Sequence, residues 1–362
     1  MLNPPIRVGI LGCGMVAAEY ATTLASSDLV TLVACADADA EPGRAAAFAA
    51  THAIPRVMDA TRLLDPDAVD VVVVLTPPAT HAALTHAAIA AGIPAVWVEK
   101  PLTASPEEAF DLLRAAHTAG VRLGAAPDTP LAPPTRTAAT ALRDGLIGEP
   151  VAASASLLCP GPERWHPDPE QFHAAGAGPL GDMAPYYLAT LHHLLGPITR
   201  VAGAAAITRT RRTIRAGERA GQTFTASAPT HVTAVLETES GLPVTFTASF
   251  DAVATRAPHL EIHGSDGTLV LPDPNFHTGP VMIRTRDQPT WEALTPAGRP
   301  ETAVGRGMGV LDLARCLLEG NSPVETATVA AHTVAVTHAI LTAAATGTVT
   351  RVPTPAPRGR AG

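Results

Sequence analysis

The chain has 362 residues, of which 46% are hydrophobic and 16% charged, and its formal net charge is -8. This length fits two domains of ordinary size with a substantial core. The acidic balance argues against a nucleic-acid or membrane-surface binder, and no apolar run reaches the length of a membrane span. The N-terminus lacks a signal-peptide pattern, so we expect a cytoplasmic protein.

Cysteine and lysine are both scarce in this sequence. Four cysteines, Cys13, Cys35, Cys159 and Cys316, are scattered without a C-x-x-C pair, which argues against a metal site or a disulfide framework. Lys100 is the single lysine among 25 basic residues. Arginine can replace lysine on a surface, but it cannot release a proton near neutral pH. The alternative to a chemical role for Lys100 is that one lysine has remained by chance in a sequence where arginine has replaced all others.

The first third of the chain alternates short β-branched runs with alanine-rich stretches. The runs lack strict apolar–polar alternation, as expected of strands covered on both faces. We predict strands over residues 6–11, 29–36, 69–75, 95–99 and 121–125, and helices near 16–26, 42–52, 79–91 and 106–119. This β-α-β series predicts a doubly wound parallel sheet, an α/β fold, in residues 1–127.

The pattern changes after residue 127, where a proline-rich stretch begins. Further helices are predicted near residues 131–145, 182–195, 308–319 and 324–346, and strands over 198–209, 231–237, 242–250, 259–263 and 268–271. These strands follow one another without intervening helices, which predicts a mostly antiparallel sheet. We therefore expect a second, α+β domain over residues 128–352 and a disordered tail over 353–362.

The segment Gly12-Cys13-Gly14-Met15-Val16-Ala17 joins the first predicted strand to the first helix. Gly12 suits the tight turn, and Gly14 lets the backbone approach a pyrophosphate. The helix that begins near Met15 and Val16 would point its N-terminus at the phosphates. The motif is weak alone, but here it has the required strand–turn–helix context. These residues are candidate cofactor ligands.

Asp37 follows the second predicted strand, where a carboxylate accepts hydrogen bonds from an adenosine ribose. The next residue, Ala38, offers no cation for a 2′-phosphate, so the sequence favours NAD over NADP. Arg44 is the nearest positive residue, and we expect it on the exposed face of the next helix.

Two motifs close neighbouring strands of the predicted parallel sheet. Thr76-Pro77-Pro78-Ala79-Thr80-His81 follows one strand, and Glu99-Lys100-Pro101 follows the next. Ligands bind at the carboxyl ends of the strands in open α/β sheets. Both motifs are therefore expected at the ligand-binding edge, although Glu99 and Lys100 could instead form a local ion pair.

With these motifs the sequence resembles the Gfo/Idh/MocA family of oxidoreductases, to about residue 350. The resemblance is carried by Gly12-Cys13-Gly14, Thr76-Pro77 with His81, Glu99-Lys100-Pro101, and Gly176-Ala177-Gly178-Pro179-Leu180-Gly181-Asp182. It implies an N-terminal Rossmann domain and a C-terminal domain with a large open sheet that commonly mediates dimers or tetramers. It also implies reversible oxidation of a hydroxyl on a sugar, cyclitol or related polyol.

By this resemblance Lys100 would contact the reacting hydroxyl, and Thr76, Pro77, His81 and Glu99 would lie at the cofactor. A partly desolvated lysine has a lowered pKa and can share the proton that leaves the hydroxyl. Glu99 is expected to position backbone or ribose groups rather than to act as a base.

One motif departs from the family pattern D-x-x-x-H-x-x-D, because its positions are occupied here by Asp182, Tyr186 and Ala189. On one continuous helix, Asp182, Tyr186 and His193 would share a face. Tyr186 can donate or relay a proton, but it is a poor base alone because its ordinary pKa is near 10. Asp182 and Tyr186 are thus candidate catalytic residues, although Tyr186 could instead only shape the pocket.

Three further residues are candidate substrate contacts. Asp128 follows the last strand of the parallel sheet, and a solvated turn is the alternative. Trp165 could stack on a sugar face, and His166 could supply the missing acid or base. The arginines between residues 209 and 219 are expected in a solvated loop.

Two other functions stay open. Tightly held NAD could be used transiently for a redox-assisted elimination or glycoside cleavage, and a non-catalytic nucleotide-binding protein is the second alternative. We expect no metal, no nucleic-acid partner and no membrane.

Overall fold

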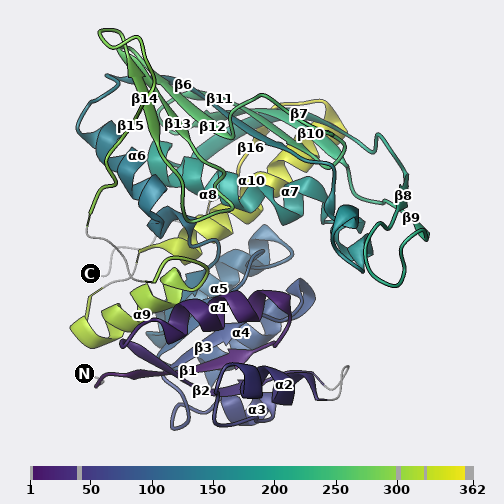
Figure 1. Cartoon of the computed structure of the whole chain (residues 1–362), viewed down its shortest axis with the longest axis vertical. Coiled ribbons are helices and arrows are strands. Elements are labelled where there is room, and N and C mark those ends of the chain that lie inside the picture. Colours follow the sequence, from purple (N-terminus) through teal and green to yellow (C-terminus); the bar gives the residue numbers. More distant parts are fainter. Residues whose placement is uncertain (1–2, 39–42, 299–302, 322–323, 355–362) are drawn as a thin grey trace. The chain divides into compact units, whose positions relative to one another are not determined.

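Figure 1 shows the chain as a computed structural model, which describes residues 3–38, 43–298, 303–321 and 324–354. Contacts divide the chain into two compact units. Unit 1 comprises Met1–Thr140, Pro274–Val281 and Leu294–Ala331, and unit 2 comprises Ala141–Asp273, Met282–Ala293 and His332–Gly362. The predicted boundary at residue 127 therefore leaves out two later segments that return to unit 1. Most of the predicted tail lies outside the described residues.

Unit 1 is built on a five-stranded parallel sheet, as the sequence predicts. Its strands are β1 (Ile6–Leu11), β2 (Val30–Ala36), β3 (Val71–Val74), β4 (Ala95–Val98) and β5 (Arg122–Ala125). They lie in the order β2-β1-β3-β4-β5, and every pair is parallel. The β3 and β4 side chains are all buried, which explains the unbroken apolar runs.

The helices of unit 1 begin and end close to the predicted positions, except for the short α3, which was not predicted. They are α1 (Met15–Ala25), α2 (Arg44–Thr51), α3 (Ala60–Leu63), α4 (His81–Ala90), α5 (Pro106–Ala119), α6 (Pro133–Arg143) and α9 (Met308–Glu319). The short turn η1 (Pro78–Thr80) precedes α4, and η2 (Thr129–Leu131) precedes α6. Ser105 caps α5 by accepting a hydrogen bond from the Glu108 amide at 3.3 Å. Gly120 ends that helix in the left-handed conformation.

Helix α9 belongs to unit 1, although it comes late in the chain. Trp97 of β4 is completely buried, and an added Cβ on Gly309 of α9 would lie 2.0 Å from its ring. A glycine at this position therefore lets the helix pack directly on the indole. The Thr326 hydroxyl accepts a hydrogen bond from the Ala125 amide at 3.3 Å and holds the next segment to β5.

Unit 2 contains a nine-stranded sheet with the order β15-β14-β13-β12-β6-β11-β10-β7-β16. Its strands are β6 (Pro150–Leu158), β7 (Ile198–Ala206), β10 (His231–Thr238), β11 (Pro243–Ser249), β12 (Leu260–Gly264), β13 (Gly267–Leu271), β14 (Met282–Thr285), β15 (Glu292–Ala293) and β16 (Thr350–Arg351). All its pairs are antiparallel except β6 with β11. A separate hairpin joins β8 (Arg211–Thr213) to β9 (Thr223–Thr225).

The helices of unit 2 depart from the prediction at one point. They are α7 (Gly178–Asp182), α8 (Ala184–Leu195) and most of α10 (Thr326–Thr346), with short turns η3 (Pro162–Arg164) and η4 (Pro169–His173). The helix predicted over 182–195 is confirmed as α8 except at its start: Asp182 ends the preceding short helix α7, which was not predicted, and the chain breaks at Met183. Pro185 lies in the first turn of α8 and has no amide proton to continue the earlier helix.

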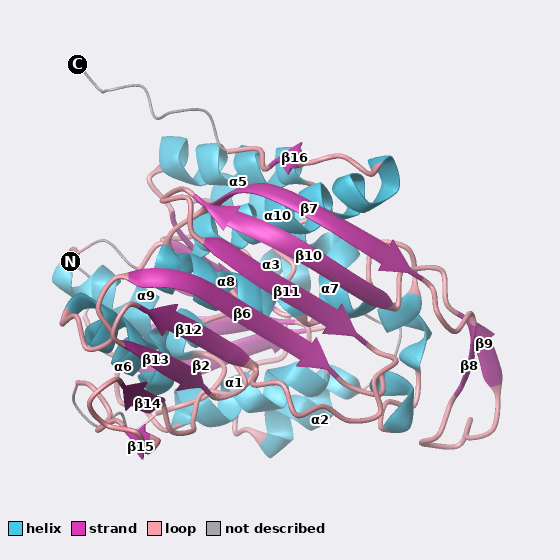
Figure 2. Ribbon diagram, turned by 90° about the horizontal axis from the view of Figure 1, so that it is seen from above, coloured by secondary structure: helices cyan, strands magenta, loops and turns pink. Residues whose placement is uncertain are grey.

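The nine-stranded sheet has one covered and one open face. Figures 1 and 2 show α8 and α10 against one face, and no helix in the described ranges covers the other. Side chains near the middle of the open face include Ala204, Thr233, Val235 and Thr245, which are all exposed, and the same face carries an ion pair between Arg200 and Glu237.

Helix α10 is the one described helix that is long and apolar enough to cross a membrane. Its most apolar window has a mean hydropathy of 1.4, but 72% of that window is buried inside the structure. A core helix meets the same criteria, so the length and composition of α10 are weak support for a membrane span.

Candidate functional site

The turn between β1 and α1 is shaped by two glycines. Gly12 has a φ of +97°, and a Cβ there would lie 2.7 Å from the Leu75 carbonyl oxygen. A Cβ on Gly14 would meet nothing within 4 Å, so this position borders open space. Gly14 is also the N-cap of α1, and it provides no side-chain hydrogen bond to the helix. The open space and the first-turn amides of α1 fit a pyrophosphate.

Asp37 lies directly beyond β2 and contacts the glycine turn. Its carboxylate accepts hydrogen bonds from the Cys13 amide at 3.0 Å and the Ala38 amide at 2.7 Å. Burial alone would raise the pKa of Asp37, but the hydrogen bonds from Arg44 and these amides outweigh burial and lower it. Asp37 therefore stays ionised and can accept a ribose hydroxyl.

The expectation that Arg44 lies on the exposed helix face is wrong. Its Nε donates to Asp37 Oδ2 at 2.6 Å and its Nη2 to Oδ1 at 3.0 Å. Helix α2 begins at Arg44, so this side chain lies in the first turn and reaches back to the end of β2. The Arg44 guanidinium therefore lies beside the carboxylate that is expected to bind the ribose, and the two side chains form an ion pair.

His81 links the two motifs at the ends of β3 and β4. Its side chain is buried, with Nε2 at 2.7 Å from the Thr76 carbonyl oxygen and Nδ1 at 2.7 Å from the Pro101 carbonyl oxygen. The two ring nitrogens therefore contact the backbone of two loops, the one after β3 and the one after β4 that contains Lys100. The structure places His81 as a brace between those loops.

Glu99 is buried and holds the backbone at Lys100. Its Oε2 accepts a hydrogen bond from the Lys100 amide at 2.7 Å, and its Oε1 accepts one from the Tyr20 hydroxyl at 3.0 Å. The Trp97 indole in turn donates to the Tyr20 oxygen at 2.9 Å. Burial and the Glu99 charge raise the pKa of Tyr20 well above its ordinary value, so it remains a donor. These contacts fit the predicted positioning role of Glu99.

Lys100 itself is half-buried and lies two residues beyond β4. The single lysine is therefore at the carboxyl edge of the parallel sheet, together with Thr76, Pro77 and the glycine turn.

Asp128 is buried, and its contacts are with unit 1 itself. One carboxylate oxygen lies 2.7 Å from Nε2 of His277, and the other accepts from the Gly307 amide at 2.8 Å and the Gly309 amide at 3.2 Å. Burial would raise the pKa of Asp128, but these partners lower it. These bonds favour a structural role, in which Asp128 holds the start of α9, over the predicted substrate contact.

Asp182 and Tyr186 lie on different helices of unit 2, on either side of the break at Met183. Asp182 is the half-buried last residue of α7, whereas Tyr186 is buried in the first turn of α8. Burial raises the pKa of the Cys159 thiol, and the nearby charge of Asp182 raises it further. Asp182 thus lies close to the end of β6.

Trp165 and His166 lie in the predicted loop, and the indole is exposed. Trp165 has 59% of its surface exposed, and its ring lies 5.3 Å from His166 and 6.3 Å from Phe172 between centroids. His166 Nδ1 accepts a hydrogen bond from the Asp168 amide at 3.0 Å.

The solvated loop expected between residues 209 and 219 is contradicted at Arg212, which is 2% exposed. It pairs with Glu163 and Asp251, carboxylates that lie 49 and 39 residues away in the sequence. The residues around Arg212 in the sequence do not indicate that it pairs with carboxylates so far away.

A polar cluster around Tyr187 was not predicted. The Tyr187 hydroxyl donates to Asp273 at 3.0 Å and lies 2.8 Å from His259 Nδ1. Burial and the Asp273 charge raise the pKa of Tyr187, so the hydroxyl stays protonated. The partners lie 86 and 72 residues away, and no local motif marks them.

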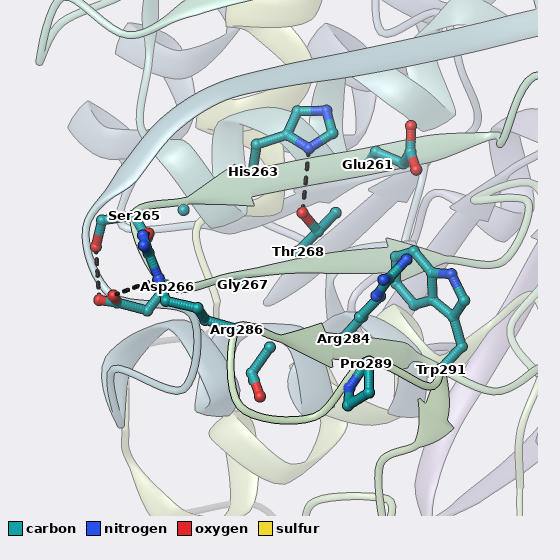
Figure 3. A pocket seen from close by; sticks show the side chains of 12 residues that line it. Glu261, His263, Ser265, Asp266, Gly267, Thr268, Arg284, Arg286, Pro289 and Trp291 are labelled. Carbon is teal, nitrogen blue, oxygen red and sulfur yellow. Dashed lines mark hydrogen bonds and ion pairs between the residues drawn. The ribbon is translucent and has the colours of Figure 1, made fainter.

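A hollow of about 490 Å³ lies over β12 to β14 of unit 2 (Figure 3). Figure 3 shows Trp291 and Arg284 side by side on one side of it. None of the predicted site residues lines this hollow. Among the described residues, no group of three or more His, Cys, Asp or Glu side chains could hold a metal ion.

The fold is similar to that of solved oxidoreductases. A structure of levoglucosan dehydrogenase in complex with NADH superposes with a TM-score of 0.81, over 96% of this chain and 99% of that one. The two sequences are 19% identical, so this likeness concerns the fold alone.

Two curated relatives are sugar reductases. The chain is 35% identical over 220 residues to dTDP-3,4-didehydro-2,6-dideoxy-alpha-D-glucose 3-reductase of Streptomyces antibioticus, covering 59% of this chain and 64% of that protein. It is 29% identical to 1,5-anhydro-D-fructose reductase of Ensifer adhaerens, covering 82% and 86% of the two chains. The first match thus spans just under two thirds of the relative.

Two family models match successive parts of the chain. Residues 6–126 match the oxidoreductase family with an NAD-binding Rossmann fold, and residues 135–270 match the GFO/IDH/MocA C-terminal domain. Both models describe the same family; together they cover the parallel sheet and the nine-stranded sheet from β6 to β13, which ends one residue beyond the match. The chain therefore belongs to the GFO/IDH/MocA family of oxidoreductases.

Proposed function

We propose that this protein is an NAD-dependent oxidoreductase that transfers a hydride between nicotinamide and a secondary hydroxyl of a sugar, cyclitol or related polyol. The observation that carries the proposal is the position of Lys100, the single lysine, at the carboxyl edge of the parallel sheet. The sugar substrates named for the two curated relatives support the substrate class.

Unit 1 offers the groups that a dinucleotide needs. The open space at Gly14 and the α1 amides would accept the pyrophosphate, and Asp37 would accept the ribose hydroxyls. Met15, Val16, Thr76 and Pro77 line the same edge of the sheet. When bound, the nicotinamide ring accepts or donates the hydride. NADP is disfavoured, since the ionised Asp37 would repel a 2′-phosphate.

Lys100 is proposed to exchange the hydroxyl proton as the carbinol carbon is oxidised or the carbonyl reduced. Glu99 and His81 would keep the Lys100 backbone in place, because they hold the loop from both sides. Arginine cannot fill this role, since the guanidinium does not release a proton near neutral pH.

Residues of unit 2 are proposed to take part on the substrate side. Asp182 can accept a hydrogen bond from a substrate hydroxyl, and Tyr186 can donate or relay a proton. The exposed Trp165 suits stacking on a sugar, and His166 is the other candidate for the acid or base that the family motif places at Tyr186.

The experiment is a Lys100→Arg variant assayed for NADH formation with NAD and a polyol panel. We expect kcat to fall by about 10²–10⁴-fold, the usual contribution of a positioned acid or base, while NAD binding stays unchanged. Unchanged turnover would remove the mechanism. Steady NADH release by the wild-type enzyme would exclude a recycled cofactor, and NAD binding without turnover of any polyol would favour a non-catalytic role.

We also propose a homo-oligomer, a dimer or tetramer, that forms through the open face of the nine-stranded sheet. The exposed Val235 and its small neighbours Ala202 and Ala204 give that face an apolar centre. A cytoplasmic location is proposed as well, because the four cysteines are free thiols.

A further inference from the structure

Two segments of unit 2 form one substructure, which we name the aromatic arm: residues 160–177 and residues 207–228. The first segment contains η3 and η4, and the second contains the β8–β9 hairpin. Figure 2 shows this hairpin beyond the strand ends of the nine-stranded sheet. The segments are far apart in sequence, so specific contacts must hold them together.

A buried arginine lies at the base of the arm. Arg212 Nε and Nη2 donate to Glu163 Oε1 at 2.9 and 2.6 Å, and Nη2 also donates to the Phe250 carbonyl at 2.8 Å. Its Nη1 donates to Asp251, which also accepts from Thr230. Burial would raise the pKa of both carboxylates. Hydrogen bonds from His173 and Arg212 lower the pKa of Glu163, and those from Thr208, Thr230 and Arg212 lower that of Asp251 to about 2. The network therefore stays ionised near neutral pH.

Buried ion networks are weak sources of net stability, because desolvation offsets their attraction. They do fix one geometry, since breaking one partner leaves an unpaired buried charge. The network is thus better explained by a need for fixed geometry than by a need for stability.

Backbone contacts hold the first segment on either side of its exposed part. The Glu163 carbonyl accepts from the Arg215 amide at 2.8 Å, and the His173 carbonyl accepts from the Ser227 and Ala228 amides at 2.9 and 3.0 Å. Arg219 adds ion pairs to Asp168 and Glu170 between these points. Residues 164–172 are therefore fixed at both ends and in the middle.

The part that is held so firmly presents an aromatic group to solvent. Trp165 is 59% exposed, and Phe172 and His166 support it from behind, with their rings 4.9 Å apart. An exposed indole whose neighbours are fixed in this way offers a preorganised apolar face to a ligand. The supporting helical turn η4 also packs against α7, which ends at Asp182. The indole is thus connected to the proposed substrate side of unit 2.

We infer that Arg212 is a positioning residue that fixes Trp165 as a platform for the apolar C–H face of a closed sugar ring. The inference rests on the proposed function and narrows it, because an open-chain polyol has no such face. The electron-rich face of an indole suits the C–H groups on one side of a pyranose, whereas the hydroxyls point outward to polar groups. Arg212 acts through the placement of Trp165 and not by touching substrate.

The test compares a methyl pyranoside with the matching open-chain alditol. We expect Trp165→Ala to raise KM for the pyranoside about 3–10-fold, the value of one aromatic contact, with kcat and the KM for the alditol unchanged. Trp291→Ala is the matched control, since Trp291 is also exposed but lies outside the arm. Equal effects on ring and open-chain compounds would overturn the inference.

Arg212→Met tests the positioning role. The measurement uses a Trp291→Phe background, in which two tryptophans remain. Trp165 is then the exposed one, because Trp97 is buried. We expect lower Trp165 fluorescence anisotropy, and a rise in KM for the pyranoside that disappears when Trp165 is already alanine. An additive rise, or unchanged anisotropy, would overturn the role of Arg212.

Two further measurements keep the inference testable. If Arg212→Met does not fold, Arg219→Gln takes its place, because it removes exposed ion pairs of the same arm; unchanged anisotropy and KM would then reject the inference.

If no polyol is turned over, the proposed function fails, and quenching of Trp165 emission by the pyranoside still measures the ring contact. Absence of quenching there would reject the platform.

Discussion

Asp37 and Arg44 form a charge pair at the position where the two nicotinamide cofactors differ. The carboxylate would accept the ribose hydroxyls of NAD, and it would repel the 2′-phosphate of NADP. The guanidinium beside it could bind that phosphate, but its Nε and Nη2 are engaged by Asp37. The preference for NAD therefore depends on one side chain, while a phosphate-binding cation is already in place.

Asp37→Ser removes the repulsion and releases Arg44 toward the phosphate. We expect the ratio of NADP to NAD affinity to rise by about 10–100-fold, the value of a hydrogen bond to a charged group. Fluorescence titrations with NADH and NADPH measure this ratio without any substrate.

The double variant Asp37→Ser, Arg44→Ala is the control for this change. It should lose the gain in NADPH affinity, because no cation remains at the site. A gain that persists in the double variant would show that Arg44 does not hold the phosphate.

Single residues also show where prediction from the sequence stops. The position of Lys100 and of the glycine turn at the carboxyl edge of the parallel sheet was predicted from composition and motif, because these signals are local in the sequence. Arg212 was expected in solvent, since its neighbours are polar and arginine-rich. Its burial depends on Glu163 and Asp251, which only the folded chain brings together.

At the scale of elements, the turn between β1 and α1 separates a folding role from a binding role. Gly12 is confined by the backbone at Leu75 and Thr76 and has a positive φ, whereas Gly14 faces open space. A methyl group added at the two positions should therefore have different consequences.

We expect Gly12→Ala to lower both the melting temperature and NAD affinity, because the Cβ collides with the backbone. Gly14→Ala should leave the melting temperature almost unchanged and weaken NAD binding at least tenfold, since its Cβ fills space that the pyrophosphate needs. Thermal unfolding and NADH titration measure the two effects. A fully folded Gly14→Ala variant with normal NADH affinity would contradict the proposed phosphate position.

The five parallel strands were all predicted, because β1 to β4 are rich in β-branched residues and β5, with the sequence RLGA, continues the alternation of strands and helices. Strand β6 was missed, because its sequence PVAASASLL is rich in alanine and serine and has little intrinsic strand preference. Its place in the middle of the nine-stranded sheet comes from pairing with β11 and β12. Helix α7 was missed for a different reason, because its sequence GPLGD contains two glycines and a proline, which disfavour a helix.

At the scale of the whole molecule, the open sheet face is the feature that we connect to assembly. Val235 is 53% exposed and pairs in register with Ala202 of β7 and Thr245 of β11. An arginine there would place an unpaired charge in an interface between two such faces.

Val235→Arg should therefore convert the proposed oligomer to monomer, as measured by sedimentation velocity. Val253→Arg is the matched control, because Val253 is 80% exposed but lies outside the strands of the sheet. The proposed interface would be ruled out if both variants kept the wild-type mass, or if the wild-type protein sedimented as a monomer.

The packing of Gly309 on Trp97 matters for any attempt to produce unit 1 separately from unit 2. A fragment cut at residue 127 would lack α9 and would leave the largest buried side chain of the parallel sheet facing water. Such a fragment is expected to aggregate. A protein made of this unit alone must carry the distant stretches 274–281 and 294–331 along with the first 140 residues, so the two units cannot be separated at a single point in the gene.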